Sequence, residues 1–454
     1  MEKQSILRTL ILLVSCLFLL MPLARGQLSV SENGRYLVTP DGTPFLWLGD
    51  TGWGLFQKLT REDVDFYFKA RAEQGFSVVH AALAHKNPFV VPGLENIYGD
   101  PAFADEASLI PALTEGNDPD DDQAYDYWDH VDYIVDRANE HGLYLVFLPI
   151  FGLAEDDGYN LINPGNASDY GRFLGKRYKD KTNIIWCMGG DVLAGSQKCK
   201  TIWNLLAKAI TEAVAGKEDY AKTLMTYHVR GGHSSSQYFE NAPWIDIHMI
   251  QTWASYTRIY NMVSKDYHNE VVRPVLHGEG AYEDGPEYPT KPITPLKIRN
   301  QAYWATFAGG MHTYGNSNTW SFGTSAYYVT KDWKEAVFSE GAENLSVYHQ
   351  FFKSIKWWEF VPDQSIISKG VGAEDSLNVA MYSERTDQVL VYLSGQSEVA
   401  LDLKNSIKAK KTTGEWINPK TGERRNAGNL KPAKSMVCKT PDGWDDALLL
   451  IGKD

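Results

Sequence analysis

Short apolar runs recur between residues 45 and 320, and each ends in polar or glycine residues. Most are followed by a stretch in which apolar positions have helical spacing. The apolar runs predict eight β-strands, at residues 45–50, 76–84, 143–152, 183–191, 223–232, 244–252, 273–280 and 309–318. The helical stretches predict helices at residues 61–74, 124–141, 168–179, 200–215, 256–269, 295–308 and 343–355.

This alternation predicts a parallel sheet whose outer face is covered by helices. Eight repeats in about 275 residues fit a closed (β/α)8 TIM barrel better than an open doubly wound sheet. No G-x-G-x-x-G follows the first predicted strand, which further weakens a dinucleotide-binding alternative. The sequence therefore predicts an α/β fold built on a TIM barrel.

The pattern changes after the tryptophan pair at 357–358. From about residue 366 onward, short alternating runs are separated by turn signals, which is typical of a small antiparallel β-sandwich. We therefore expect a barrel at residues 27–358 and a C-terminal sandwich at residues 359–454.

The first 26 residues have the pattern of a signal peptide, because two basic residues precede an apolar stretch and small residues precede Gln27. A periplasmic or secreted location is the expectation. The residues before Cys16 resemble a lipobox, so a lipid anchor is the alternative, although the apolar stretch continues past this cysteine. No other segment is long and apolar enough to span a membrane.

The chain is acidic, with a net charge of −13. An acidic surface repels phosphate backbones, and no basic patch with interleaved aromatic residues is present in the sequence. Nucleic acid is therefore not an expected partner. A neutral ligand, or one bound in a local pocket, fits this charge better.

Two acids stand at the ends of predicted strands that face each other across an eight-stranded ring. Asp191 ends the fourth strand and Glu279 ends the seventh, and the reactive groups of such barrels lie at these C-terminal ends. Two facing carboxylates are what glycoside hydrolysis needs, one as a proton donor and one for the sugar carbon or a water. We therefore expect Asp191 and Glu279 to be catalytic. A helix N-cap is the other interpretation of Asp191.

The remaining strand ends carry aromatic rings that suit sugar faces and polar groups that suit hydroxyls. The residues expected to bind substrate are Asp50, His85, Asn87, His228, Gln251, Tyr282, Tyr314 and Trp320. Asp50 has a second interpretation, as the cap of a turn. The histidines lie on scattered strands rather than in tight local spacing, so neither a metal site nor another cofactor is expected.

Four stretches are distinctive: GRYLVTPDGTPFLWLGDTGW near the N-terminus, IIWCMGGD, VLHGEGAYE and GGMHTYGNSNTW. In this order they resemble the apiosidase-like (β/α)8 hydrolases, glycoside hydrolase family 140. The resemblance covers roughly residues 28–355, and the tail is similar to the collagen-binding-like domain that commonly follows that barrel.

The resemblance implies hydrolysis of a β-linked apiose in the side chains of rhamnogalacturonan II, a pectin. By motif it implies Asp191 as the acid/base and Glu279 as the nucleophile, with Glu283 in the same loop as a competitor. Gly-Gly-Asp stands where the larger clan of barrel glycosidases has Asn-Glu. Because the acid is shorter, the carboxylate separation, and with it retention or inversion, stays open.

Three hypotheses follow. The first is an exported, cofactor-free exo-glycosidase that acts on an oligosaccharide. The second is a non-catalytic surface protein whose barrel and sandwich bind glycans or collagen. The third is a metal-dependent hydrolase, which would lose activity to chelators.

Overall fold

The computed structural model describes residues 26–86, 93–121, 123–151, 161–285, 293–323, 329–430 and 435–452. The expected signal peptide, apart from Gly26, and the expected substrate residue Asn87 lie outside these described residues. Among the described helices, none combines the length and the apolar character that a membrane crossing needs.

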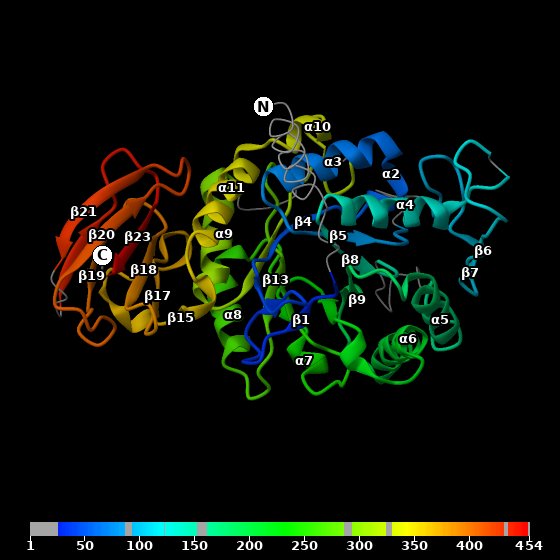
Figure 1. The fold of residues 1–454 in the computed structure, drawn as a ribbon, viewed down its shortest axis with the longest axis horizontal. Helices are drawn as coiled ribbons and strands as arrows, with labels where there is room; N and C mark the ends of the chain where they lie inside the picture. Colours follow the sequence, from blue (N-terminus) through cyan, green and yellow to red (C-terminus); the bar gives the residue numbers. More distant parts are fainter. Residues whose placement is uncertain are drawn as a thin grey trace, which may run out of the picture.

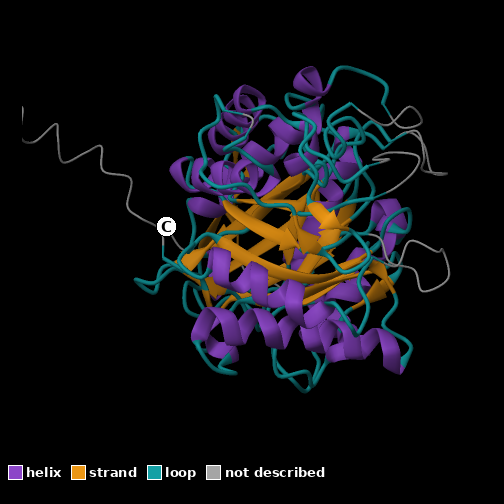
Figure 2. Cartoon of the chain, turned by 90° about the vertical axis from the view of Figure 1, so that its right-hand side faces the viewer, coloured by secondary structure: helices purple, strands orange, loops and turns teal. Residues whose placement is uncertain are grey.

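Within the described residues, eight parallel strands form the centre of the N-terminal part, and helices surround them (Figures 1 and 2). The strands are β4 (Leu48–Thr51), β5 (Val78–Ala82), β8 (Tyr144–Leu148), β9 (Ile184–Val192), β10 (Met225–Val229), β12 (His248–Gln251), β13 (Val275–Glu279) and β14 (Met311–Tyr314). Their order is β10-β9-β8-β5-β4-β14-β13-β12, and the short β11 (His233–Ser234) is antiparallel to β12.

The ring closes between β10 and the chain that leads into β12. The backbone N–H groups of Asp246 and Ile247 both donate to the Met225 carbonyl, at 2.9 and 3.2 Å. This nearly closed parallel ring confirms the predicted (β/α)8 barrel, and each of the eight predicted strands overlaps one of its strands.

The helices lie outside the ring, as predicted from their spacing. They are α2 (Leu55–Lys58), α3 (Arg61–Glu73), α4 (Tyr127–Glu140), α5 (Ala167–Tyr178), α6 (Gln197–Ala215), α7 (Ser236–Phe239), α8 (Ile259–Tyr267), α9 (Pro295–Phe307), α10 (Trp333–Ala336) and α11 (Glu340–Lys353). Several begin at side-chain caps: Thr60 accepts from the third backbone N–H of α3, and Ser196 and Thr294 do the same for α6 and α9. The helix after β10 is reduced to the single turn of α7.

The C-terminal part consists of two antiparallel sheets, which confirms the predicted sandwich. The larger sheet has the order β15-β17-β18-β23-β20-β21, and the smaller has the order β16-β19-β22. Their strands are β15 (Val361–Pro362), β16 (Ile367–Lys369), β17 (Val379–Ser383), β18 (Gln388–Leu393), β19 (Glu398–Leu401), β20 (Thr412–Ile417), β21 (Arg424–Leu430), β22 (Met436–Lys439) and β23 (Ala447–Gly452). Val391 and Leu449 of the larger sheet share one apolar core with Val399 and Leu401 of the smaller.

The larger sheet has a second buried face, which packs on the barrel. Leu390, Tyr392 and Leu448 from this face belong to one apolar cluster with Trp304 of α9 and Phe351 of α11. The sandwich therefore lies directly against the helices that follow β13 and β14 (Figure 1).

The N-terminal part also contains five further short strands: β1 (Ser29–Val30), β2 (Leu37–Val38), β3 (Pro44–Phe45), β6 (Phe103–Asp105) and β7 (Ile110–Pro111).

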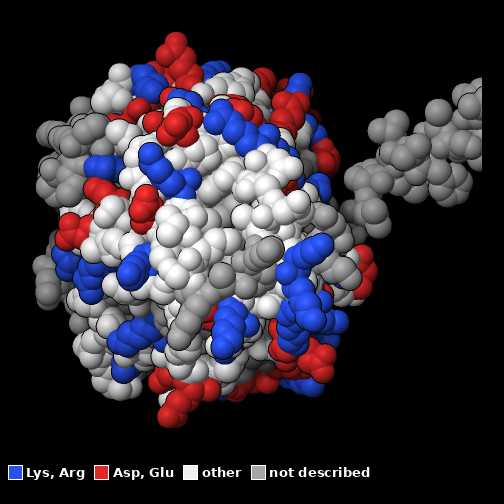
Figure 3. All heavy atoms as spheres, turned by 90° about the vertical axis from the view of Figure 1, so that its left-hand side faces the viewer, with Lys and Arg blue, Asp and Glu red and all other residues white. Residues whose placement is uncertain are grey.

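On the face at the sandwich end of the molecule, acidic and basic side chains are interspersed around an uncharged centre (Figure 3). That face therefore presents no single-sign patch among its described residues.

Candidate active site

Asp191 stands at the C-terminal end of β9, where a bulge interrupts the pairing with β10. Beyond the pair Gly189–His228 the register shifts, and Gly190 and Asp191 have no partner on β10. Gly189, Gly190 and Asp191 all have positive φ angles, of 92°, 121° and 59°. A Cβ on Gly189 would lie 2.3 Å from the His228 carbonyl oxygen, so only glycine fits there. The bulge turns the strand end and directs the Asp191 carboxyl into the mouth of the barrel, the opening at the C-terminal ends of the parallel strands.

The N-cap interpretation of Asp191 does not hold. The next helix, α6, begins at Gln197, and its N-cap is Ser196.

Glu279 ends β13, and a second bulge precedes it. Gln251 of β12 pairs with Glu279, whereas the residue before Gln251 pairs with His277, so that Gly278 is the extra residue. A Cβ on Gly278 would lie 2.6 Å from the Met249 sulfur, so a larger residue there would displace the Met249 side chain. Each acid thus owes its direction to a bulge built on glycine.

The two acids converge on one histidine. His228 Nε2 lies 3.2 Å from Glu279 Oε2, and His228 Nδ1 lies 3.7 Å from Asp191 Oδ1. One carboxylate oxygen of each acid and one ring nitrogen of His228 all lie within 4.8 Å of one another. The Asp191 backbone N–H donates to Nδ1 at 3.3 Å. We therefore assign the proton of the neutral ring to Nε2, which donates it to Glu279.

The surroundings favour a proton on Asp191. Its side chain is 44% exposed, but desolvation by the surrounding protein and the nearby Glu279 carboxylate together raise its pKa to about 6. His228, Gln251 and Arg230 oppose this shift. Burial alone lowers the pKa of His228, but the hydrogen bond to Glu279 and the charges of both acids outweigh burial and raise it. An acid with a pKa near 6 can protonate a leaving group in mildly acidic solution.

Aromatic rings line the mouth beside His228. The Trp53 ring centre lies 5.0 Å from both the Phe151 and the His228 rings, and the Phe151 ring lies 4.4 Å from that of His85. Burial and the charge of Lys58 lower the pKa of His85 to about 3, so His85 is a neutral part of this wall. Trp53 and Phe151 were not among the expected site residues. Both stand near the C-terminal end of a predicted strand, which is the position from which the other site residues were selected.

Gln251 and Trp253 extend the site at the end of β12. The Gln251 side chain acts on Asp191 by lowering the pKa of its carboxyl, and Gln251 Oε1 has no partner within the described part of the chain. Trp253 is 45% exposed and has a φ angle of 45°. A Cβ on Gly231 would lie 3.1 Å from the Trp253 Cβ, so Gly231 gives this residue room. An exposed indole at the rim of the site offers a flat apolar face to a ligand.

Trp253→Ala is therefore expected to raise KM about fivefold and to change kcat less than about threefold, because an aromatic contact of this kind contributes about 1 kcal/mol to binding. Steady-state kinetics on the substrate check this result. Phe338→Ala, which removes a similarly exposed ring (51%) in the turn between α10 and α11, is the matched control and should leave both constants unchanged. An unchanged KM for Trp253→Ala would remove this residue from the site.

Asp50 does not fit the substrate-binding role expected for it. Its side chain is fully buried, and Oδ2 accepts hydrogen bonds from Arg71 Nε and the Tyr67 hydroxyl, each at 2.5 Å. Both partners belong to α3, so the carboxylate points from the barrel wall into the helix layer. Asp50 is the buried anion that neutralises Arg71.

Tyr314 and Glu283 likewise bind each other away from the mouth. The Tyr314 hydroxyl donates to Glu283 Oε2 at 2.6 Å, and the Gly341 backbone N–H donates to Oε1 at 2.8 Å. Tyr314 is 1% exposed and Glu283 is 3% exposed. The substrate-binding role of Tyr314 therefore does not fit the structure. Glu279, and not its competitor Glu283, is the carboxylate that meets Asp191.

Tyr282 and Trp320 lie beside the aromatic wall. The Tyr282 hydroxyl accepts a hydrogen bond from Trp53 Nε1 at 3.1 Å, which joins the loops after β13 and β4. The Trp320 ring centre lies 6.4 Å from that of His85. The structure thus places His85, Tyr282 and Trp320 around the mouth, whereas His228 and Gln251 contact the acids directly.

The donor set of Asp191, His228 and Glu279 is also one that a divalent transition metal accepts. However, both ring nitrogens of His228 already have partners, the Asp191 backbone N–H and the Glu279 carboxylate. A cation would have to displace one of them. The hydrogen-bonded arrangement fits hydrolysis by two carboxylates better than metal ligation.

A (β/α)8 barrel with two acids that converge from its fourth and seventh strands defines a glycoside hydrolase. Residues 31–359 match the family model described as "Apiosidase-like, catalytic domain". The chain belongs to this apiosidase-like family. Residues 361–451 match the model described as "Putative collagen-binding domain of a collagenase".

Solved structures agree with this assignment. A structure titled "Glycoside hydrolase" is 28% identical, with a TM-score of 0.81, and the match covers 94% of this chain and 97% of the other. A glycoside hydrolase family 5 protein from Bacteroides vulgatus is 29% identical, with a TM-score of 0.80 and coverage of 94% and 93%. A structure whose title names a "putative glycoside hydrolase" from the same organism, at 16% identity and a TM-score of 0.67, shares the fold. A search of curated proteins finds no match.

Proposed function

We propose that this glycoside hydrolase removes a terminal sugar, apiose, from the side chains of rhamnogalacturonan II in plant pectin. The convergence of Asp191 and Glu279 at the barrel mouth is the observation that carries the hydrolytic part of this proposal. The match to the apiosidase-like model supports the choice of sugar. The export expected from the N-terminal sequence is part of the proposal, because pectin is met outside the cytoplasm.

In the proposed reaction Asp191, protonated, gives its proton to the glycosidic oxygen as that bond breaks, and Glu279 attacks the sugar carbon. Asp191 then takes a proton from the water that releases the sugar from Glu279. The carboxylate oxygens lie within 4.8 Å of each other. Retaining glycosidases hold their carboxyl groups about 5–5.5 Å apart, and inverting ones need about 6.5–9.5 Å to admit a water. The separation favours retention, so the released sugar keeps its anomeric configuration.

The test is digestion of rhamnogalacturonan II oligosaccharides, with product sugars identified by chromatography and their configuration followed by NMR in the first minutes. Apiose of retained configuration is expected, at the same rate with and without a chelator. Release of a different sugar would contradict the proposed substrate and would leave the proposed two-carboxylate mechanism in place. Binding without turnover, unchanged in the Asp191→Asn and Glu279→Gln variants, would instead favour the glycan- or collagen-binding alternative.

The activity is expected to fall as the pH rises above about 6. Asp191 must be protonated to act as the acid, and its pKa is raised from 3.8 to about 6, so the active form is lost as pH rises through that value. The measurement is kcat/KM against pH, on a substrate with a poor leaving group. An activity that stays level to pH 8 would contradict the assignment of Asp191 as the acid.

A further inference from the structure

Helix α9 holds the backbone that follows Glu279. The Gln301 side chain is 1% exposed, its Oε1 accepts from the Ala281 N–H at 2.9 Å, and its Nε2 donates to the Ala281 carbonyl at 3.0 Å. A Cβ on Gly280 would lie 2.1 Å from Gln301 Oε1, so the amide lies directly against the peptide after Glu279. Two hydrogen bonds from one planar amide fix both the position and the tilt of this segment.

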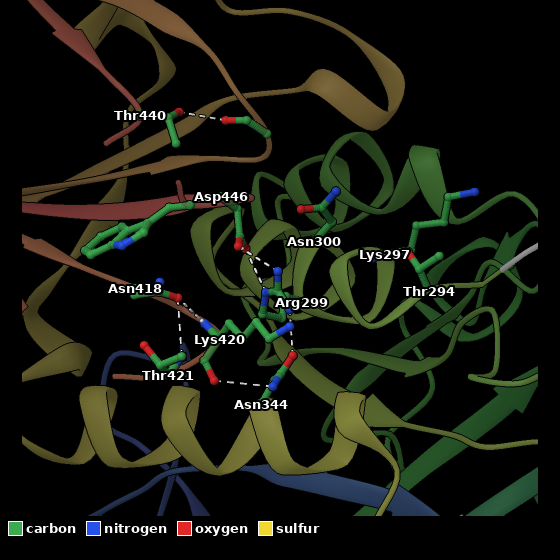
Figure 4. A network of polar contacts seen from close by, with 12 residues as sticks. Thr294, Lys297, Arg299, Asn300, Asn344, Asn418, Lys420, Thr421, Thr440 and Asp446 are labelled. Carbon is green, nitrogen blue, oxygen red and sulfur yellow. Dashed lines mark hydrogen bonds and ion pairs between the residues drawn. The ribbon is translucent and has the colours of Figure 1, made fainter. Parts of the chain in front are cut away.

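The residues beside Gln301 on α9 are held by the sandwich (Figure 4). The Arg299 guanidinium donates to both carboxylate oxygens of Asp446, at 2.9 and 2.7 Å, and to Asn344 of α11 at 2.6 Å. The Tyr392 hydroxyl lies 2.6 Å from Asn300 Oδ1 and 2.7 Å from Asp446 Oδ2. Asp446 precedes β23 and Tyr392 belongs to β18, so both contacts come from the larger sheet.

Aromatic contacts also fix α9 to the sandwich. The Tyr303 and Tyr392 rings are stacked, with centres 4.2 Å apart and an angle of 17° between them. Trp304 Nε1 donates to the Leu377 carbonyl at 2.9 Å. All of these side chains on α9 are buried, so the helix is fixed on the sandwich side by groups that water cannot replace.

The loop after β12 rests on the same support. The Tyr256 hydroxyl donates to Asp375 Oδ1 at 2.6 Å, and the Tyr256 and Trp304 rings are parallel within 9°. Gln251 is the last residue of β12, and Trp253 lies near the start of this loop. The segment after β13 and the loop after β12, which both lie beside Glu279, are therefore connected to the sandwich within one or two contacts.

From these contacts we propose that Gln301 is a positioning residue for Glu279, and that the sandwich sets this position through the Arg299–Asp446 pair. The proposal rests on the role of Glu279 in the proposed function. A buried ion pair contributes little net stability compared with apolar side chains, but it defines one geometry. A displacement of a catalytic group by about 1 Å can cost about 100-fold in rate. The C-terminal domain then acts as part of the catalytic unit, whatever else it binds.

The test compares Gln301→Met with Gln74→Met. Gln74 is a second buried glutamine, at the C-cap of α3, and its amide donates to the carbonyl of Val337, between α10 and α11, at 3.0 Å. Gln301→Met is expected to lower kcat about 30-fold and to change KM less than about threefold. Gln74→Met should lose similar thermal stability and keep kcat. Equal kcat values in the two variants would overturn the proposal.

The double variant Arg299→Met/Asp446→Leu removes the pair without leaving a buried charge. It is expected to remain folded by circular dichroism and to lower kcat in the same direction as Gln301→Met. Full activity in the folded double variant would refute the role of the sandwich and leave that of Gln301.

A readout without substrate separates this proposal from the proposed function. The ionisation of the His228 ring, followed by NMR on histidine-labelled protein and assigned with His228→Gln, reports the position of the Glu279 carboxylate that it contacts. Gln301→Met should shift this ionisation by at least about half a pH unit, and Gln74→Met should not. No shift in Gln301→Met would overturn the positioning role even if no glycoside were hydrolysed.

Discussion

Replacing Glu279 with Gln, or Asp191 with Asn, is expected to lower kcat by at least about 1,000-fold on the natural substrate, because each change removes a group that forms or protonates a bond in the reaction. Both changes keep the shape of the side chain. Asn tolerates the positive φ angle at position 191 about as well as Asp, so the bulge should persist. Steady-state kinetics and circular dichroism on the purified variants are the measurements.

The leaving group distinguishes the two roles. An activated aryl glycoside departs without a proton, so Asp191→Asn should recover much of its first-step rate on that substrate, and Glu279→Gln should not. Glu283→Gln is the matched control, because the structure places this acid in the outer layer with Tyr314. Its kcat should remain within about threefold of the parent. A Glu283 variant as inactive as Glu279→Gln would contradict the assignment.

Asp50→Asn is expected to lower the free energy of unfolding by about 3–5 kcal/mol, because it leaves the guanidinium of Arg71 buried without a counter-charge. The folded fraction should nevertheless keep its kcat, since Asp50 faces the helix layer and not the mouth. Denaturant unfolding and active-site-normalised kinetics measure the two effects.

Asp65→Asn provides the comparison for this change. Asp65 also pairs with an arginine, Arg137, but its side chain is 42% exposed, and such surface pairs contribute less than about 1 kcal/mol. If Asp50→Asn were as stable as Asp65→Asn and inactive, Asp50 would belong to the site after all.

The barrel could be predicted because its strands are apolar along their whole length and its helices carry regular spacing and caps. The same order of strands brings Asp191 and Glu279 to one end of the ring. Position along the chain therefore carries much of the information about which residues surround the mouth.

The direction of each side chain could not be predicted in this way. Asp50 and Tyr314 end their strands as Asp191 and Glu279 do, yet they face outward, because adjacent residues of a strand point to opposite sides. The register at each strand end decides the side, and at β9 and β13 bulges change that register. The glycines of GGD and of the HGEG stretch are the local sequence signal of these bulges. Their effect on the neighbouring acid depends on contacts with His228 and Met249 from other strands.

The apolar cluster that joins Leu390 and Tyr392 to Trp304 and Phe351 has a consequence for how such chains diversify. A gene fragment that encodes the sandwich cannot be exchanged alone, because the barrel and the sandwich each bury apolar side chains of the other. Recombination that separates them would have to bring a compatible partner surface, so the two halves are expected to be inherited together.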